Sequence, residues 1–376
     1  MMKTNLLIIV VLAFLLLTSP LFAQTDIQRK AFTPSFLSIA EYRSYERSFN
    51  NSTLTVSQFS SPIAIKLPLR QNLAIDLASS FVTASVGDSK LTGLTDVKAR
   101  AVTMLFKDTL MLNAGIGVPN GKSDLDIEET AVSMLLSDKA LGFKYNRLGE
   151  GLDLNFGGGF AHAFGTMTIG VGAGYIIKGE YTYAKDSEVK YKPGNQLNVT
   201  GGFDVHAGSL LLRTDGTYTK YNPDESDGEE VFTEGQRISI EESAIISMTR
   251  LGLVLSGRYI NRGKSEWIPQ VDLPFGVLPD KKTSKLYGDQ INANAGLSLQ
   301  IVKGFNLNFL GESAFIMKNE DDINDAKVFG FGGGFTIKSS KGSFLDIVGK
   351  YYIGNSNDST VDLRGFSATT AIRLIF

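Results

Sequence analysis

Apolar and small polar residues alternate along most of this chain. In the segment 151–164, for example, one face carries Leu152, Leu154, Phe156 and Phe160, while the other carries mainly Asp, Asn and Gly. A period of two residues predicts β-strands with two different faces. The polar face is rich in Gly, Asn, Thr and Ser rather than in long charged side chains, which suits a crowded, wet lumen. The pattern predicts an all-β, antiparallel transmembrane β-barrel, with a soluble β-sandwich as the alternative.

Segments with this alternation can be counted along the chain. We expect strands near 52–68, 72–85, 94–106, 109–118, 151–164, 166–182, 195–206, 209–221, 236–248, 250–262, 288–302, 305–318, 327–338, 343–355 and 361–376. This tally is odd, whereas bacterial barrels have an even number of strands. We therefore predict that Ser35 to Arg47 is the first strand of a barrel of about 16. In the alternative, this segment folds inward as a plug and the barrel has 14 strands.

The connections between these segments alternate between short and long. Short turns on the periplasmic side and long loops outside are typical of outer-membrane barrels. The long, polar set comprises Gly87 to Gly93, Pro119 to Glu150, Ala184 to Gly194, Asn222 to Gly235, Asn261 to Tyr287, Asn319 to Asp325 and Asn355 to Thr360. We expect this set to face the environment.

One long loop contains a helical pattern. Residues 127–141 have acidic residues early and Lys139 late, as the helix dipole favours. We predict a short helix that buries Val132, Met134, Leu135 and Leu136. Two placements remain open: the helix folds into the barrel mouth as a constriction and apolar binding wall, or it caps the rim.

The two ends of the sequence predict the compartment. Residues Met1 to Ala23 have one charge, Lys3, and an apolar run, which together predict a secretory signal peptide; a retained membrane helix is the alternative. Residues 24–376 then form a single barrel domain. The last strand stops on Phe376 and is expected to pair with the first strand. We expect a Gram-negative outer membrane as location, its lipid and lipopolysaccharide as surroundings, and the barrel-assembly machinery as a partner of the C-terminal strand.

Composition narrows the possible chemistry. The chain has 37 Lys and Arg against 39 Asp and Glu, so its charge balance does not indicate a nucleic-acid partner. It has no Cys, which excludes disulfides, thiol nucleophiles and thiolate metal sites. Its two histidines, His162 and His206, each lie beside a predicted short turn, away from the outer rim where barrel enzymes do their chemistry. We expect no catalytic residues, no metal site and no cofactor.

Ionisable residues gather on the predicted inward face of the strands. These candidate lumen residues are Asp76, Asp96, Lys98, Arg100, Asp153, Lys178, Glu180, Asp204, His206, Arg213, Asp215, Arg258, Arg262, Glu312, Asp346, Lys350 and Arg373. Their signs are mixed, which fits structural pairing between neighbouring strands. A selectivity filter for charged solutes is the second interpretation.

One part of the chain resembles known channels. The segment GLTDVKARAVTML at 93–105, followed by LMLNAGIGVPNGK at 110–122, resembles outer-membrane channels of the phenol meta-pathway type, which are broadly similar to FadL-type transporters. The resemblance covers about a tenth of the chain. It implies a monomeric barrel that passes small hydrophobic molecules without covalent chemistry. FadL-type transporters also carry an N-terminal hatch with an Asn-Pro-Ala motif, and this chain lacks that motif.

Two functions follow from the sequence. The first is an outer-membrane channel for passive uptake of small, hydrophobic or aromatic molecules, gated by the 127–141 helix. The second is a barrel without transport, with an adhesive or structural role carried by the loops 222–235 and 261–287.

Overall fold

The computed structural model describes residues 32–50, 52–106, 109–268, 282–321 and 325–376. The predicted signal peptide, Met1 to Ala23, lies outside the described residues. No helix in the described part of the chain is long and apolar enough to cross a membrane.

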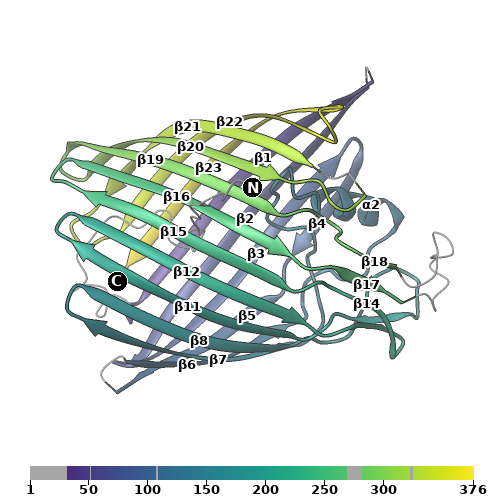
Figure 1. Ribbon diagram of the computed structural model, residues 1–376, viewed down its shortest axis with the longest axis horizontal. Coiled ribbons are helices and arrows are strands. Elements are labelled where there is room, and N and C mark those ends of the chain that lie inside the picture. Colours follow the sequence, from purple (N-terminus) through teal and green to yellow (C-terminus); the bar gives the residue numbers. More distant parts are fainter. Residues whose placement is uncertain (1–31, 51, 107–108, 269–281, 322–324) are drawn as a thin grey trace, which may run out of the picture.

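Antiparallel strands form one large sheet that closes on itself (Figure 1). Its strands are β1 (Ser35–Phe49), β2 (Ser52–Arg70), β3 (Leu73–Val86), β4 (Ser89–Leu94), β5 (Val97–Leu105), β6 (Leu110–Val118), β7 (Asp153–Phe164), β8 (Met167–Ile177), β11 (Gln196–Ala207), β12 (Leu210–Tyr221), β15 (Arg237–Ser247), β16 (Leu251–Arg262), β19 (Gln290–Val302), β20 (Phe305–Ile316), β21 (Ala326–Lys338), β22 (Phe344–Ser356) and β23 (Val361–Ile375). Strands β4 and β5 pair with successive parts of β3, so they share one place in the wall. The described residues therefore build a closed barrel of 16 strands.

The first and last strands close the barrel. Strand β1 pairs with β2 on one side and with β23 on the other, from Ser35 opposite Ile375 to Ser48 opposite Asp362. The predicted 16 strands are thus confirmed, and the prediction of Ser35 to Arg47 as the first strand is correct. The alternative of an inner plug and 14 strands is wrong, because this segment forms hydrogen-bonded ladders along both of its edges.

Three predicted boundaries differ from the structure. The expected loop 87–93 is mostly strand β4, since the chain reverses in a tight turn at Gly87, whose φ is +56°. The expected strand 94–106 is interrupted at Asp96, between β4 and β5. The expected strand 166–182 ends at Ile177. Local alternation continues through these positions, so it could not reveal where pairing stops.

The outward face of the barrel carries the apolar half of the alternation. Phe156, Phe160, Val171, Phe203 and Phe331 belong to it and are 44–59% exposed. The residues that alternate with them face inward, and many are Gly, Asn, Thr or Ser. Burying large apolar side chains drives folding in water, so an outward belt of exposed aromatic and aliphatic side chains indicates an apolar surrounding.

A second, smaller sheet lies beyond one end of the barrel, on the right in Figure 1. It consists of β9 (Tyr181–Thr182), β10 (Lys190–Lys192), β13 (Asp224–Ser226), β14 (Glu229–Thr233), β17 (Ser265–Trp267) and β18 (Lys282–Ser284). Three of the long loops supply these strands, and Phe232 of β14 packs on Trp267 of β17 with ring centroids 4.5 Å apart. The described parts of these loops thus form strands that their polar sequences did not predict.

Candidate functional site

A capped helix stands in the loop between β6 and β7. Helix α2 (Ile127–Leu136) begins after Asp126, whose carboxylate accepts a hydrogen bond from the Glu129 amide at 2.9 Å. The Glu129 carboxylate accepts one in return from the Asp126 amide at 3.2 Å. This capping box satisfies two amides that a helix start otherwise leaves without partners. The helix is predicted correctly, but it ends at Leu136 because the chain turns at Asp138, whose carboxylate accepts from the Ala140 amide.

Helix α2 buries one narrow face. Val132 and Leu136 are almost completely buried in a cluster with Val82 of β3 and Leu91 of β4. Met134, expected to be buried, is 69% exposed. Leu135, also expected to be buried, is only half-buried. Residues four apart share a helix face, whereas a residue two positions along lies on the far side, so Met134 points away from β3 and β4.

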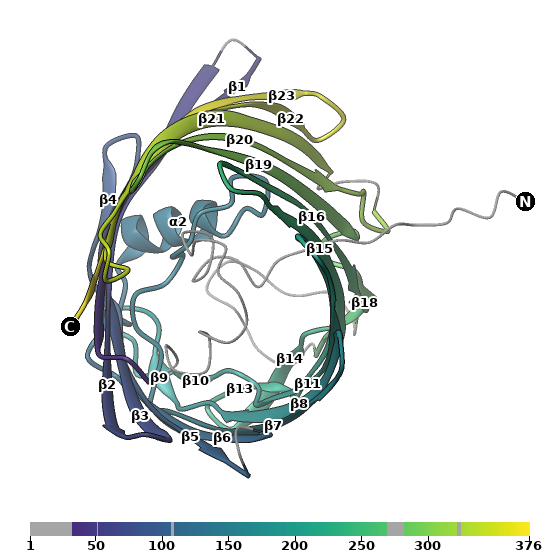
Figure 2. The same ribbon diagram turned by 90° about the vertical axis from the view of Figure 1, so that its left-hand side faces the viewer.

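The loop that contains α2 lies inside the barrel. Arg43 on the inward face of β1 donates to the carbonyl of Gly142 at 2.8 Å. Gln58 on the inward face of β2 donates to the carbonyl of Tyr145 at 2.5 Å and accepts from its amide at 3.3 Å. The rings of Tyr45 and Phe143 pack edge to face, with their centroids 5.9 Å apart. Figure 2 shows α2 within the ring of strands. Of the two predicted placements, the structure has the inward one; that the helix limits passage stays a prediction.

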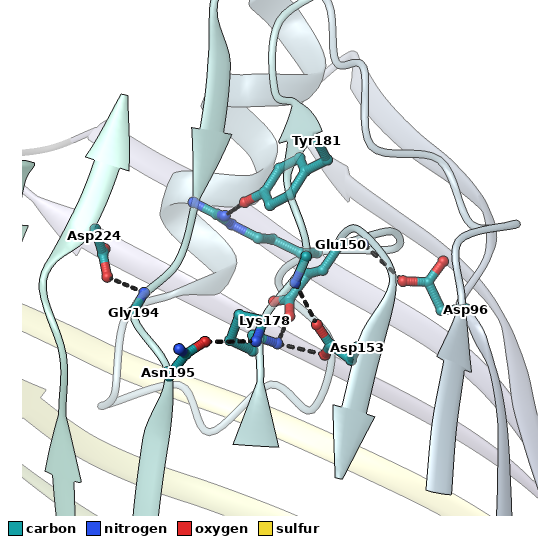
Figure 3. A network of polar contacts seen from close by, with 10 residues as sticks. Asp96, Glu150, Asp153, Lys178, Tyr181, Gly194, Asn195 and Asp224 are labelled. Carbon is teal, nitrogen blue, oxygen red and sulfur yellow. Dashed lines mark hydrogen bonds and ion pairs between the residues drawn. The ribbon is translucent and has the colours of Figure 1, made fainter. Parts of the chain in front are cut away.

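A single carboxylate holds the base of this loop. Asp96, at the break between β4 and β5, accepts from the Gly121 amide at 2.8 Å and from the Glu150 amide at 2.7 Å. Its own amide donates to the carbonyl of Leu148 at 3.0 Å. Asp96 is 8% exposed. The two ends of loop 119–150 are therefore fastened to one side chain, which we call the Asp96 clasp. Figure 3 shows its hydrogen bond with Glu150.

A second anchor joins the same loop to β7 and β8. Lys178, just beyond the end of β8, contacts the carboxylates of Glu150 at 2.5 Å and Asp153 at 2.6 Å (Figure 3). Burial alone raises the pKa of Glu150, but the Lys178 ammonium outweighs it and lowers that pKa below its usual value. Burial opposes the charged form of Lys178 as well, yet the two carboxylates raise its pKa. Both groups are thus held in their charged forms.

The neighbouring loops are tied down by tyrosines. Arg147 donates to the Tyr181 hydroxyl, and the Tyr191 hydroxyl donates to Asp224. Burial is the main cause of a raised pKa at both Tyr191 and Asp224. Asp224, on β13, also accepts from the Gly194 amide at 2.6 Å, which links β13 to the segment between β10 and β11.

Six of the predicted lumen residues form three ion pairs across the inward face. Asp204 and Arg213 face each other in the β11–β12 register and form two hydrogen bonds, of 2.8 and 2.7 Å. Asp76 and Arg100 meet at 2.8 Å between β3 and β5. The third pair, Glu312 and Lys350, is 2.5 Å apart. The structure thus brings these six together as the pairing interpretation requires, and their effect on selectivity stays a prediction.

The Glu312–Lys350 pair explains why two positions of β21 are glycine. Glu312 lies on β20 and Lys350 on β22, so the pair reaches across β21. A Cβ at Gly330 would come within 2.8 Å of the Glu312 side chain. One at Gly332 would come within 2.8 Å of the Lys350 side chain. These glycines of β21 leave room for two long side chains to meet above the strand between them.

Other predicted lumen residues have different surroundings. Asp215 on β12 stands opposite Glu241 on β15, which in turn stands opposite Arg258 on β16. Arg258 donates to the Ser239 hydroxyl at 2.9 Å, and Asp346 accepts from the Thr336 hydroxyl at 2.6 Å.

Several inward charges were not predicted. Glu41, Arg43 and Glu241 lie on the lumen side, and Arg43 contacts Glu41 at 3.2 Å. The parity of β1 was obscured because Ser and Tyr occur on both of its faces. In β23 the inward and outward residues are clearly distinguished, so its pairing with β1 shows which residues of β1 face inward.

One cavity along the barrel wall is lined in part by glycines. A cavity of about 930 Å³ lies along β3, β5 to β8, β11 and β12, where Lys98, Asp153 and the Asp204–Arg213 pair border it. Inward glycines of β7 and β8, such as Gly159, Gly172 and Gly174, form much of this wall. They leave space that any side chain would fill. In Figure 2, strands β6, β7, β8 and β11 lie across the ring from α2.

Among the residues that the structure describes, no group of three or more His, Cys, Asp or Glu could hold a metal ion.

Comparison with known proteins gives barrels of similar structure at low sequence identity. No family model and no curated protein matches this chain. Among solved structures, OccAB1 of Acinetobacter baumannii is 11% identical, with 91% of this chain and 96% of that chain covered and a TM-score of 0.48. The CymD monoaromatic hydrocarbon channel is 10% identical, with 92% and 88% covered and a TM-score of 0.44. An outer membrane channel from Pseudomonas putida F1 is 9% identical, with 92% and 96% covered and a TM-score of 0.41. Similarity at this level carries no information on the solute, and a relation to FadL-type transporters is not among these findings.

Proposed function

We propose that this protein is an outer-membrane channel through which small molecules diffuse passively. The observation that carries the proposal is the closed barrel with an apolar outward face and a polar, hollow inward face.

The outward face supports a membrane location. In hydrocarbon every backbone polar group needs a partner within the protein, and a closed barrel supplies all of them. Pairing of β1 with β23 leaves no open edge in this wall. The exposed Phe, Val, Leu and Ile side chains then face lipid instead of water.

The inward face supports passage. A cavity of about 930 Å³ is large enough for a small organic solute. Loop 119–150 occupies another part of the lumen and reduces its free cross-section, which suits diffusion limited by solute size. Passive channels need no cofactor, and the paired inward charges give the lumen mixed polarity rather than one strong sign.

Conductance in a planar lipid bilayer tests the proposal. The refolded wild-type protein should give discrete, ohmic current steps. Gly159→Phe should reduce them, because a Cβ at Gly159 lies at an ordinary 3.4 Å from the nearest atom, the Val171 carbonyl oxygen, so that the ring extends into the cavity. Gly349→Phe is the matched control: Gly349 is on the outward face, and a Cβ there meets nothing within 4 Å. The absence of any current from the folded wild-type barrel would refute the channel and favour the adhesive or structural role of the loops.

The narrower expectation of a hydrophobic or aromatic solute comes from the sequence resemblance. Solute flux into liposomes, compared between phenol-sized neutral molecules and sugars of similar volume, tests it separately from conductance.

A further inference from the structure

A second, smaller cavity lies at the mouth of the barrel, where the long loops emerge. It has a volume of about 200 Å³ and lies between helix α2 and the ends of β20, β21 and β22. None of the lumen ion pairs described above borders it.

One side of this mouth cavity is apolar. Met134 and Leu135 of α2 line it together with Ile316 of β20 and Ala326 of β21. Met134 is the residue that turns away from the buried face of α2 and remains 69% exposed. A flexible, polarisable thioether at such a position adapts to apolar groups of varied shape.

The other side of the mouth cavity is polar and incompletely satisfied. Ser356, on the inward face of β22, is 4% exposed. Its hydroxyl has no hydrogen-bond partner within the part of the chain that the structure describes. Buried hydroxyl groups in proteins are normally bonded, so an unbonded one in the wall of a cavity indicates a missing partner.

The charged side chains that line the mouth cavity, Arg47, Asp138 and Asp325, carry one net negative charge. Arg47 and Asp138 border it and pair with each other at 3.2 Å. Asp325 adds a second carboxylate, one oxygen of which accepts from the Asp358 amide at 2.8 Å. The Asp325 carboxylate therefore favours a ligand that donates a hydrogen bond over an anionic ligand.

We infer that the mouth cavity binds a small organic molecule with an apolar body and a hydrogen-bond-donating head, an alcohol or an amine, with the head at Ser356 and the body against Met134. The size fits, since engineered cavities of roughly 150 Å³ accept benzene. The inference rests on the proposed channel function in one respect, that the site lies on the path of the solute.

Equilibrium binding tests the site independently of conduction. The protein is refolded in detergent with its methionine methyl groups labelled with ¹³C, and the Met134 signal is assigned from the Met134→Leu variant. Benzyl alcohol, benzylamine and benzoate share one body and differ in the head. We expect a saturable shift of the Met134 signal with the alcohol or the amine, and at least tenfold weaker binding of benzoate. Met248, 60% exposed at a turn far from the cavity, reports partition of the probe into detergent.

Two serine variants test the contact with the head group. Ser356→Ala should weaken binding of benzyl alcohol about five- to tenfold, the usual contribution of one hydrogen bond, and leave toluene binding unchanged. Ser256→Ala, which removes another buried inward hydroxyl away from the cavity, should change neither.

The outcomes separate this inference from the channel itself. No saturable shift at Met134, equal binding of benzoate, or equal loss of toluene and benzyl alcohol in Ser356→Ala overturns the site. If conductance is normal in that case, the channel proposal stands. Saturable, head-dependent binding in a protein without conductance supports the site and removes its connection with transport.

Discussion

Removal of the Asp96 clasp should release loop 119–150 without opening the barrel wall. The carboxylate accepts two amide hydrogen bonds, from Gly121 and Glu150, in a position that is 8% exposed. Loss of one hydrogen bond from a buried amide to a charged acceptor lowers stability by about 1.5–3 kcal/mol, so Asp96→Ala should lower the free energy of loop opening by about 3–6 kcal/mol. Asp96 lies at a gap between β4 and β5, where no ladder hydrogen bond depends on its side chain. The cost should therefore fall on the loop.

The chain offers a clean probe for this release, because it has no cysteine of its own. Leu141, in the loop, has 0% exposure. A thiol introduced by Leu141→Cys can react with a maleimide only when the loop leaves the wall, so the labelling rate reports the open fraction. A change of 3–6 kcal/mol corresponds to labelling about 10² to 10⁴ times faster. Asp96→Asn keeps one carbonyl acceptor and should give roughly half of the free-energy effect.

Two further measurements make the test specific. Asp362→Ala removes an exposed aspartate from β23 and should leave the labelling rate unchanged. Single-channel recordings of Asp96→Ala should show larger and noisier currents, since the loop no longer occupies the lumen in a fixed place. If Asp96→Ala accelerates labelling of the introduced thiol less than threefold, other contacts, such as the one between Arg43 and Gly142, fix the loop without Asp96.

Three other predictions concern the wall, the lumen and pH. Phe331→Arg places a charge on the lipid-facing belt and should lower the free energy of unfolding in liposomes by about 2–4 kcal/mol. Asn294→Lys on the inward face should lower it by less than about 1 kcal/mol. Equal losses in denaturant titrations would contradict the assigned faces. Lys350→Gln should shift the reversal potential toward cation selectivity and Glu312→Gln toward anion selectivity, with a coupling in the double variant of about 1 kcal/mol in stability. Glu150 has a lowered pKa, so its stabilising effect is complete above its usual value of 4.5 and is lost as the pH falls through the lower folded value. Because a maleimide reacts with the thiolate, whose fraction falls with pH, the labelling rate of the Leu141→Cys variant is divided at each pH by the rate of a free cysteine peptide. This ratio should rise in acid, and a ratio that is flat from about pH 6 to pH 3 would contradict the role of the Lys178 anchor.

The strands of the barrel could be predicted because their burial is decided by local alternation. Each wall strand sits between lipid and lumen, so its two faces differ in composition wherever it lies in the chain. Helix α2 was predictable for a similar reason, as its capping residues and its charge pattern are local. Which of its faces is buried depends on the wall it meets, and this is why Met134 was placed on the wrong side.

Contacts between distant segments could not be predicted. The small sheet assembles from three loops, and its strands are too short for alternation to be visible. Asp96 gave no signal of its role, because its partners Gly121 and Glu150 come close only after the loop has folded inward. The unsatisfied hydroxyl of Ser356 likewise depends on the positions of α2 and the rim, and α2 is separated from it by more than 200 residues.

The pairing of β1 with β23 has a consequence for how the molecule is made. The two strands are more than 300 residues apart in the sequence. Their pairing therefore has the largest loop-closure entropy cost of any strand pair in the barrel. Until it forms, both flanking strands present unsatisfied amides and carbonyls that could capture a second chain. Folding should accordingly be slow and sensitive to the concentration of unfolded copies. Conditions that hold the two free edges near each other should raise the yield of closed barrels more than conditions that stabilise any individual hairpin.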